Sequence, residues 1–222
     1  GNDQLMWTSL SMALFMVGYS TTVGFAVYYM RYVFGNEGLY VVLVAVCGVS
    51  QLSALGVYSN IAKRMSRRKL YTLATMMVIA GYGIFFIAEL HILLVVAGAI
   101  IVFVGQAFIQ TLMLMFLADT VEYGEWKLGK RNESITFSMQ PFINKIGGAL
   151  STGVVSLTLI FSGIKIDGGT AEMISESGKL MLKMSMFALP LVFIVVGYVI
   201  YLKKYKISEE FYADILKDLE GK

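Results

Sequence analysis

An apolar segment from Phe137 to Leu150 contains two side chains that a bilayer disfavours, Asn144 and Lys145. If its helix starts near Ser134, Lys145 lies about 16 Å along it, close to the middle of a ~30 Å hydrocarbon core. From that depth a lysine is too short to reach an interface, which argues against a purely structural, snorkelling role. Ionisable residues inside membrane helices usually line a cavity or an ion path, so we predict that Lys145 is functional.

Other polar and small residues surround Lys145 on the same segment. Gln140 precedes it by five residues. Pro141, between Gln140 and Asn144, removes a backbone hydrogen bond and can kink the helix. Small residues follow at the spacing that close helix packing requires: Gly147, Gly148, Ser151, Thr152 and Gly153. These features predict a helix that borders a cavity.

Two other apolar segments add polar side chains at mid-depth. Gln106 and Gln110 are four residues apart and share a helix face. The run from Tyr19 to Thr22 places four hydroxyl groups in the first apolar segment. Amides and hydroxyls that face water suit a polyhydroxylated ligand. For each of these residues, an ordinary hydrogen bond between helices is an alternative explanation.

The composition indicates which elements must position these side chains. The chain is 57% hydrophobic and only 15% charged, with a mean hydropathy of +0.71, whereas soluble domains carry about 25% charged residues. A helix needs about 20 apolar residues to span a bilayer, and continuous apolar runs exclude the alternating pattern of barrel strands. The sequence therefore predicts an all-α, polytopic membrane protein with six transmembrane helices, at about 5–30, 39–60, 70–88, 92–118, 134–163 and 183–202.

Several functions are disfavoured by the residues that are present. The single cysteine, Cys47, excludes a disulfide within this chain and a cysteine-based metal site. No nucleophile, base or metal cluster falls at mid-depth, as an intramembrane enzyme would require. We therefore expect no enzyme activity, no metal site and no cofactor. The net charge of +3 gives no indication of nucleic acid binding.

The distribution of lysine and arginine predicts the orientation, because cytoplasmic segments carry an excess of both. Thirteen of them lie in the second loop, the fourth loop and the C-terminal tail, which share one side. Four lie on the other side: Arg31, Lys165, Lys179 and Lys183. We therefore predict a multi-pass protein of the plasma (inner) membrane with both termini in the cytoplasm.

The tail, 206–222, carries apolar residues at every fourth position: Ile207, Phe211, Ile215 and Leu219. Ser208 followed by Glu209 and Glu210 is a favourable start for a helix. We expect a short cytoplasmic amphipathic helix on the membrane surface, with a frayed terminus as the alternative.

No carboxylate of this chain is placed to balance Lys145. The acidic residues of the neighbouring segments lie at helix ends, with Glu89 at one end and Asp119, Glu122 and Glu125 at the other. The partner of Lys145 is therefore expected in another polypeptide, or in the remainder of a longer protein.

The stretch from Ala118 to Ser138, ADTVEYGEWKLGKRNESITFS, begins an ordered set of motifs. It resembles the signature of the glycoside–pentoside–hexuronide:cation symporters, a melibiose permease-like family of the major facilitator superfamily. The family pattern is Asp-x-x-Asp/Glu-Tyr-Gly, then Gly-x-Arg, then Phe/Tyr-Ser, then an intramembrane Lys-x-Gly. The matching residues are Asp119, Glu122, Tyr123, Gly124, Gly129, Arg131, Phe137, Ser138, Lys145 and Gly147.

The resemblance extends over the whole chain but covers only the second half of a twelve-helix family. It implies that this chain is the C-terminal six-helix half, one bundle of a major-facilitator fold. It also implies a partner, the N-terminal six-helix half. That half would hold most sugar contacts and the acidic residues that bind the coupling cation, H+ or Na+. Lys145 would face that site across the cavity.

The motif positions imply roles for individual residues. Lys145, Gln140 and Asn144 would contribute to sugar binding and coupling, and Gln110 is added by its spacing from Asp119. A second set would form a charge network at the cytoplasmic end: Asp119, Glu122, Arg131 and Lys63. The loop that carries Lys63, GVYSNIAKRMSRR, is similar to the superfamily's loop motif but lacks its usual aspartate and inner glycine.

The resemblance implies a secondary active transporter for a sugar or glycoside with a cation. Such a transporter works by alternating access, in which two bundles rock about a midplane site. A half-size carrier that acts as a homodimer is an alternative, although two copies of Lys145 would then face each other without a counter-charge. A membrane scaffold without transport activity is the other alternative.

Overall fold

The computed structural model describes residues 1–88, 91–164 and 174–221. Glu89, Lys165 and Lys222, whose charges entered the sequence analysis, lie outside these residues. The elements are α1 (Asp3–Tyr28), η1 (Tyr29–Val33), α2 (Leu39–Ala62), α3 (Arg67–Ile87), α4 (Ile92–Leu128), α5 (Glu133–Phe161), α6 (Glu176–Lys183), η3 (Met184–Ala188), α7 (Leu189–Lys204) and α8 (Glu209–Glu220).

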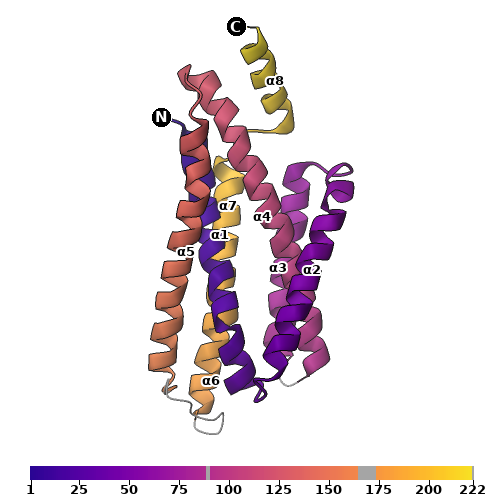
Figure 1. The fold of residues 1–222 in the computed structure, drawn as a ribbon, viewed down its shortest axis with the longest axis vertical. Coiled ribbons are helices and arrows are strands. Elements are labelled where there is room, and N and C mark those ends of the chain that lie inside the picture. The colour runs from indigo at the N-terminus through magenta and orange to yellow at the C-terminus, as the bar shows by residue number, and fades with distance from the viewer. Residues whose placement is uncertain (89–90, 165–173, 222) are drawn as a thin grey trace.

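Within the described ranges, six helical segments are long and apolar enough to cross a membrane. α1 continues into the π-helical turn η1, and α6, η3 and α7 form one continuous segment. The prediction of an all-α, polytopic membrane protein with six transmembrane helices is confirmed. Both termini lie at the same end of the bundle (Figure 1), which we call the terminus end.

Most of the membrane helices are longer than the apolar segments predicted from the sequence. α4 continues ten residues beyond position 118 and ends at Leu128. It ends there because Gly129 adopts a left-handed conformation with φ 67°, and its N–H caps the carbonyl of Glu125 at 2.8 Å. Hydropathy marks the part of a helix that lies in lipid, whereas the helix itself continues until a capping residue stops it.

The membrane helices form two groups of three. α1 packs against α5 and α7, and α4 packs against α2 and α3 (Figure 1). The two groups meet where α1 contacts α4. α1 and α4 are therefore the central helices, and α2 and α5 lie at the two flanks.

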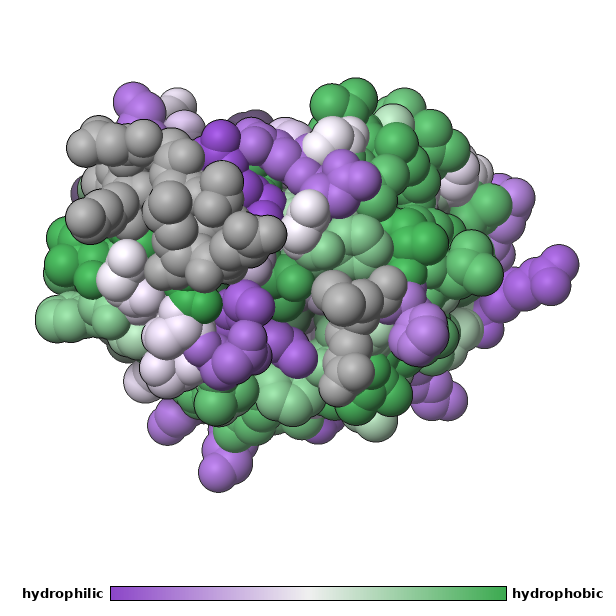
Figure 2. All heavy atoms as spheres, turned by 90° about the horizontal axis from the view of Figure 1, so that it is seen from below, coloured by the Kyte–Doolittle hydropathy of each residue, from purple (hydrophilic) through white to green (hydrophobic). Residues whose placement is uncertain are grey.

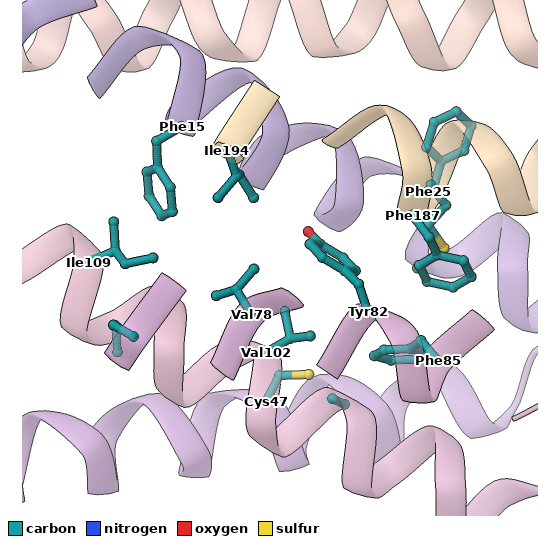
Figure 3. Close-up of a cluster of buried hydrophobic side chains, with 14 of the residues drawn as sticks. Phe15, Phe25, Cys47, Val78, Tyr82, Phe85, Val102, Ile109, Phe187 and Ile194 are labelled. Carbon is teal, nitrogen blue, oxygen red and sulfur yellow. The ribbon is translucent and has the colours of Figure 1, made fainter. Parts of the chain in front are cut away.

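Large apolar side chains fill the space between the two groups. Phe85 and Phe187 stack with their ring centroids 5.2 Å apart. Figure 3 shows Phe15 and Ile194 on one side of this core, facing Val78 and Val102 across the interior. Tyr82 points its hydroxyl away from α3 (Figure 3), and that hydroxyl shares a hydrogen bond with Thr22 of α1. A polar contact thus crosses an otherwise apolar core.

Glycines bring the central helices close to their neighbours. A Cβ on Gly105 would lie 2.8 Å from the carbonyl oxygen of Ala74, across the α3–α4 contact. A Cβ on Gly197 would lie 2.9 Å from the carbonyl oxygen of Ser11, across the α1–α7 contact. The Ser11 hydroxyl donates back to the Gly197 carbonyl at 2.8 Å. Small residues of this kind let helices associate in lipid, where no hydrophobic force draws them together.

Hydrophobic side chains cover much of the outer surface. Figure 2 views the bundle from the end opposite the termini and shows hydrophobic areas at its flanks. Large side chains such as Leu93 and Phe161 are 81% and 72% exposed. Exposed apolar surface on this scale fits a protein surrounded by lipid.

α8 packs against the end of α4 and so differs from the helix expected on the membrane surface. Ser208 caps α8 by accepting from the Phe211 N–H at 3.1 Å, and Ile215 is only 1% exposed. The apolar residues that meet here, called the tail cluster below, are Tyr123, Trp126, Tyr205, Ile207, Phe211, Tyr212, Ile215 and Leu219. The last turns of α4, which hydropathy did not predict, cover the apolar face that was expected to meet lipid.

Candidate functional site

α5 carries the lysine and has three distinct faces. The first packs against α1 and contains Ile143, Gly147 and Ser151, which are spaced four residues apart and buried. A Cβ on Gly147 would lie 3.0 Å from the Cβ of Met16, so this face fits closely onto α1. The second face is apolar and exposed: Ile135, Phe142, Ile146, Leu150, Leu157 and Ile160. We assign the second face to lipid.

The third face of α5 is polar and exposed. Ser138, Lys145 and Thr152 recur at intervals of seven residues, so they form one stripe along the helix. Asn144 and Gly148 adjoin this stripe, which points to a different side from the apolar face. We call these five residues the polar stripe. When α5 is inserted in a membrane, this stripe must face water or another part of a protein.

Lys145 occupies the centre of the polar stripe. It is the thirteenth residue of the 29-residue α5, counted from Glu133, so it lies near the middle of the membrane segment. Its side chain is exposed and forms no ion pair within the described part of the chain. A charge at this depth requires a partner or water. Either would be supplied on the side of the bundle toward which the polar stripe points, which we call the open face.

The two amides near Lys145 differ in their placement. Asn144 is exposed beside it, whereas Gln140 is half-buried. Gln140 precedes Gly147 by seven residues and therefore lies toward the α1-facing side of the helix. α5 continues as a helix through Pro141. Asn144 thus shares the stripe with Lys145, and Gln140 lies at its edge.

The two glutamines of α4 have different surroundings although they are one turn apart. Gln110 is half-buried, whereas Gln106 is fully buried. Gln106 donates to the Tyr82 hydroxyl at 3.5 Å, and its own carbonyl oxygen has no hydrogen-bond partner among the described residues. Only Gln110 remains available to a ligand at the open face.

The hydroxyl groups of α1 also differ in burial. Thr21 is buried and donates to the carbonyl of Val17 at 2.7 Å, and Thr22 is buried against Tyr82. Tyr19 is half-buried, and its hydroxyl accepts from the Gln51 amide at 3.3 Å. Gln51, on α2, did not stand out in the sequence because a single amide in an apolar helix is commonly a packing residue.

A cavity of about 230 Å³ lies beside Tyr19 and Gln51, between α1, α2 and α4. Phe103 of α4 closes one side and meets Tyr19 edge to face, with the ring centroids 6.3 Å apart. Val23 and Val44, which are 42% and 48% exposed, border the cavity and place it at the surface of the bundle. We call it the α1–α2 cavity.

Asp119 belongs to one of the charge groups at the terminus end. It is buried on α4 and pairs with Arg67 of α3. The Tyr205 hydroxyl donates to the same carboxylate oxygen at 3.0 Å. Burial and the neighbouring carboxylate raise the pKa of Tyr205, so this hydroxyl keeps its proton and its role as a donor.

Arg131 is at the centre of another charge group at the terminus end. Its guanidinium donates to Glu125 at 2.9 Å, to Glu122 at 3.1 Å and to Glu133 at 3.2 Å. Because these carboxylates accept its hydrogen bonds, they raise the pKa of the Arg131 guanidinium further. Arg131 therefore ties the end of α4 to the start of α5.

The four residues predicted for a single charge network are thus not joined in one. Glu122 and Arg131 form a pair, and Asp119 belongs to a different group. Lys63 is exposed, and it makes no ion pair within the ranges that the structure describes. Arg67, four residues on, pairs with Asp119 instead. Five basic residues crowd this loop, so the sequence could not show which of them faces α4.

The sequence is similar to those of known sugar transport proteins. The profile of a family described as MFS/sugar transport protein matches residues 1–209. A lactose permease of Lactobacillus delbrueckii subsp. bulgaricus is 33% identical over 99% of this chain. A raffinose carrier protein of Pediococcus pentosaceus is 34% identical over 99% of the chain. A glucuronide carrier protein homolog of Escherichia coli K12 is 31% identical over 62% of the chain.

The matched regions are only parts of these relatives. They cover 35% of the lactose permease, 34% of the raffinose carrier protein and 31% of the glucuronide carrier homolog. The chain therefore spans about a third of the length of the curated relatives it matches.

Proposed function

The chain belongs to the family of MFS/sugar transport proteins, and we propose that it is one six-helix bundle of a secondary active transporter that carries a sugar or glycoside together with H+ or Na+. The resemblance drawn from the motifs between Asp119 and Gly147 is confirmed at the level of the family. That it is a multi-pass membrane protein follows from the six apolar helices and the relatives. The other parts of the proposal are argued below.

The exposed charge of Lys145 is the observation that carries the proposal. A lysine near mid-depth, on a polar stripe apart from the lipid face of α5, is costly unless water or a counter-charge meets it. A transporter whose substrate cavity lies at the bilayer midplane supplies both. A membrane scaffold has no need of a charge at this position.

The class of substrate is supported by the relatives. Their names refer to lactose, raffinose and a glucuronide, all of which are molecules with glycosidic links. Amide groups such as those of Asn144 and Gln110 both donate and accept hydrogen bonds, as vicinal sugar hydroxyls require. We therefore propose a glycoside as the substrate, held in part by Lys145, Asn144, Gln110 and Gln140.

The partner of this bundle is proposed to be a second six-helix bundle, the N-terminal half of the same transporter. Two observations support it: the chain spans about a third of the length of its relatives, and no described helix covers the exposed side chains of the polar stripe of α5. The facing bundle would supply the carboxylates for the coupling cation. The described carboxylates of this chain near the cavity helices, such as Asp119 and Glu122, lie at the terminus end and not beside Lys145 at mid-depth. The homodimer alternative leaves two copies of Lys145 facing each other.

The charge groups at the terminus end are proposed to control the cytoplasmic gate. Arg131 and Arg67 are held by carboxylates of their own bundle. When the two bundles close at this end, carboxylates of the facing bundle can compete for these guanidinium groups. The ion pairs of Arg131 are exposed and therefore weak, so an exchange of these pairs biases the rocking equilibrium without locking it. This assignment places both termini in the cytoplasm and the protein in the plasma (inner) membrane.

Uptake measurements test the proposal directly. The complete transporter is reconstituted in vesicles, and uptake of radiolabelled glycosides is measured under imposed H+ or Na+ gradients. We expect gradient-driven uptake of at least one glycoside, reduced at least tenfold by Lys145→Ala. Lys130→Ala, which removes an exposed lysine from the loop after α4, is the matched control and should leave uptake unchanged.

Three other results would change the proposal. Normal uptake by Lys145→Ala would make Lys145 a structural residue and remove it from the coupling site. Uptake that ignores both gradients would contradict the coupling. Gradient-driven uptake by vesicles that contain only this chain would favour the half-size homodimer, since we expect the isolated bundle to be inactive.

A further inference from the structure

We propose that the α1–α2 cavity is a specificity subsite that receives the aglycone of the transported glycoside, the group attached to the anomeric oxygen. The inference rests on the proposed function, because it concerns how that transporter selects its substrate. The position and the lining of the cavity support the inference.

The cavity lies on the same open face as a proposed sugar contact. Phe103, in the cavity wall, and Gln110 are seven residues apart on α4 and therefore share a helix face. Seven residues correspond to about 10 Å along the helix. A ligand whose sugar ring contacts Gln110 can thus extend its other end into the cavity. This separation suits a molecule with two parts, which is what a glycoside is.

The lining decides which part of a glycoside enters. Most of the wall is apolar, including Val23, Leu43, Val44 and Phe103. A sugar ring buried here would leave hydroxyl groups without hydrogen-bond partners, which is unfavourable. An aglycone, or the C–H face of a second ring, carries fewer such groups and gains contact with aromatic rings. The cavity therefore favours the less polar end of the substrate.

A hydrogen-bonded polar pair lies beside the aromatic wall. Gln51 donates to the Tyr19 hydroxyl at 3.3 Å, which holds the Tyr19 ring against Phe103. Ligand pockets commonly combine an apolar wall with a few placed polar groups that fix orientation. The Tyr19 hydroxyl donates no hydrogen bond within the part of the chain that the structure describes, so it can donate to the glycosidic oxygen.

A glycine on α2 makes the cavity testable without disturbing the fold. Gly48 lines the cavity, and a Cβ there would meet no atom within 4 Å. Gly48→Leu therefore fills the cavity from its edge. Gly56 lies two turns further along α2, is outside the lining, and also has open space around its Cβ. Gly56→Leu is the matched control for both the added volume and the loss of glycine.

The experiment compares glycosides that share one sugar and differ only in the aglycone. The KM for uptake of a methyl glycoside and of the 4-nitrophenyl glycoside of the same sugar is measured for the complete transporter. We expect Gly48→Leu to raise the KM ratio, nitrophenyl to methyl, at least tenfold, and Gly56→Leu to leave it unchanged. Val44→Phe, a second variant that fills the same cavity from an exposed position, should change the ratio in the same direction.

Each result has a definite meaning. An unchanged KM ratio in both Gly48→Leu and Val44→Phe, with uptake intact, overturns the aglycone subsite and leaves the proposed function standing. A ratio that rises equally in Gly56→Leu also overturns it, because the effect would not be local to the cavity. If the unmodified transporter takes up neither glycoside under any gradient, the proposed function fails and the subsite fails with it.

Discussion

The carboxylate of Asp119 accepts a hydrogen bond from the guanidinium of Arg67, and this pair joins α4 to the first turn of α3 at the terminus end. The Asp119 side chain is 7% exposed and the Arg67 side chain 30%. The backbone N–H of Arg67 also donates to Glu209 at 2.8 Å, and its guanidinium lies 5.9 Å from the ring centre of Tyr212. Arg67 therefore links α3, α4 and α8.

Arg67→Ala should destabilise the protein because it leaves the buried Asp119 carboxylate with Tyr205 as its remaining side-chain donor. We expect a loss of about 1–3 kcal/mol in the free energy of unfolding. Thermal unfolding in detergent, followed by tyrosine and tryptophan fluorescence, measures it. Arg68→Ala removes an exposed neighbour and is the control. Equal shifts in the two variants would contradict the role given to the pair.

The tail cluster predicts that α8 can be released without unfolding the bundle. Ile215→Ala removes the side chain that is 1% exposed at its centre. Among the described residues, α8 contacts the end of α4 and Arg67 at the start of α3. We therefore expect faster hydrogen exchange over 209–220 while the membrane helices keep their protection. Leu216→Ala, at a half-buried position outside the cluster, should change exchange little. Unchanged exchange in Ile215→Ala would show that other contacts hold α8.

The α3–α4 contact predicts opposite effects for two glycines on one helix. A Cβ on Gly81 would lie 2.9 Å from the Val102 backbone nitrogen, so Gly81→Ala forces the helices apart and should cost about 1–3 kcal/mol. A Cβ on Gly83 would meet nothing within 4 Å, so Gly83→Ala should gain up to about 1 kcal/mol of helix propensity. Unfolding of the two variants under identical detergent conditions tests the pair. Destabilisation of similar size in both would contradict the close approach.

The sequence predicted the membrane fold well because hydropathy depends on local composition alone. Continuous apolar runs indicated all six membrane segments, and the motifs from Asp119 to Gly147 indicated the family. The helix ends were predicted less well. The last ten residues of α4 are polar enough to resemble a loop, and only the conformation of Gly129 shows where the helix stops.

The sequence could not predict toward which side of its helix each polar side chain points. A spacing of four residues places Gln106 and Gln110 on roughly one face, but a helix that packs on several sides divides that face between a buried and an open part. Gln106 is buried and turns toward Tyr82, whereas Gln110 is only half-buried. The partner of Asp119 was unpredictable for a similar reason, since choosing Arg67 over Lys63 depends on the packing of α3 against α4.

Thr22, Tyr82 and Gln106 are buried and linked by side-chain hydrogen bonds. Tyr82 shares hydrogen bonds with Thr22 and with Gln106, while the Gln106 carbonyl oxygen has no partner within the described residues. Tyr82→Phe removes the one hydrogen bond that the Gln106 amide makes there. We expect it to cost about 1–3 kcal/mol, because a buried amide is left without partners. Gln106→Leu keeps a similar volume and removes the unpartnered oxygen, so it should be neutral or stabilising.

A double-mutant cycle separates these contributions. If the cost of Tyr82→Phe comes from the stranded amide, it should largely disappear when Gln106 is already leucine, and the two changes will be strongly non-additive. Thr22 does not supply this coupling, because its hydroxyl also lies 3.3 Å from the carbonyls of Gly18 and Met186 and keeps those contacts in either variant. Unfolding free energies of the two single variants and the double variant provide the measurement. Additive values would mean that Tyr82 stabilises the core through Thr22 and its ring packing, and that Gln106 is satisfied by another route.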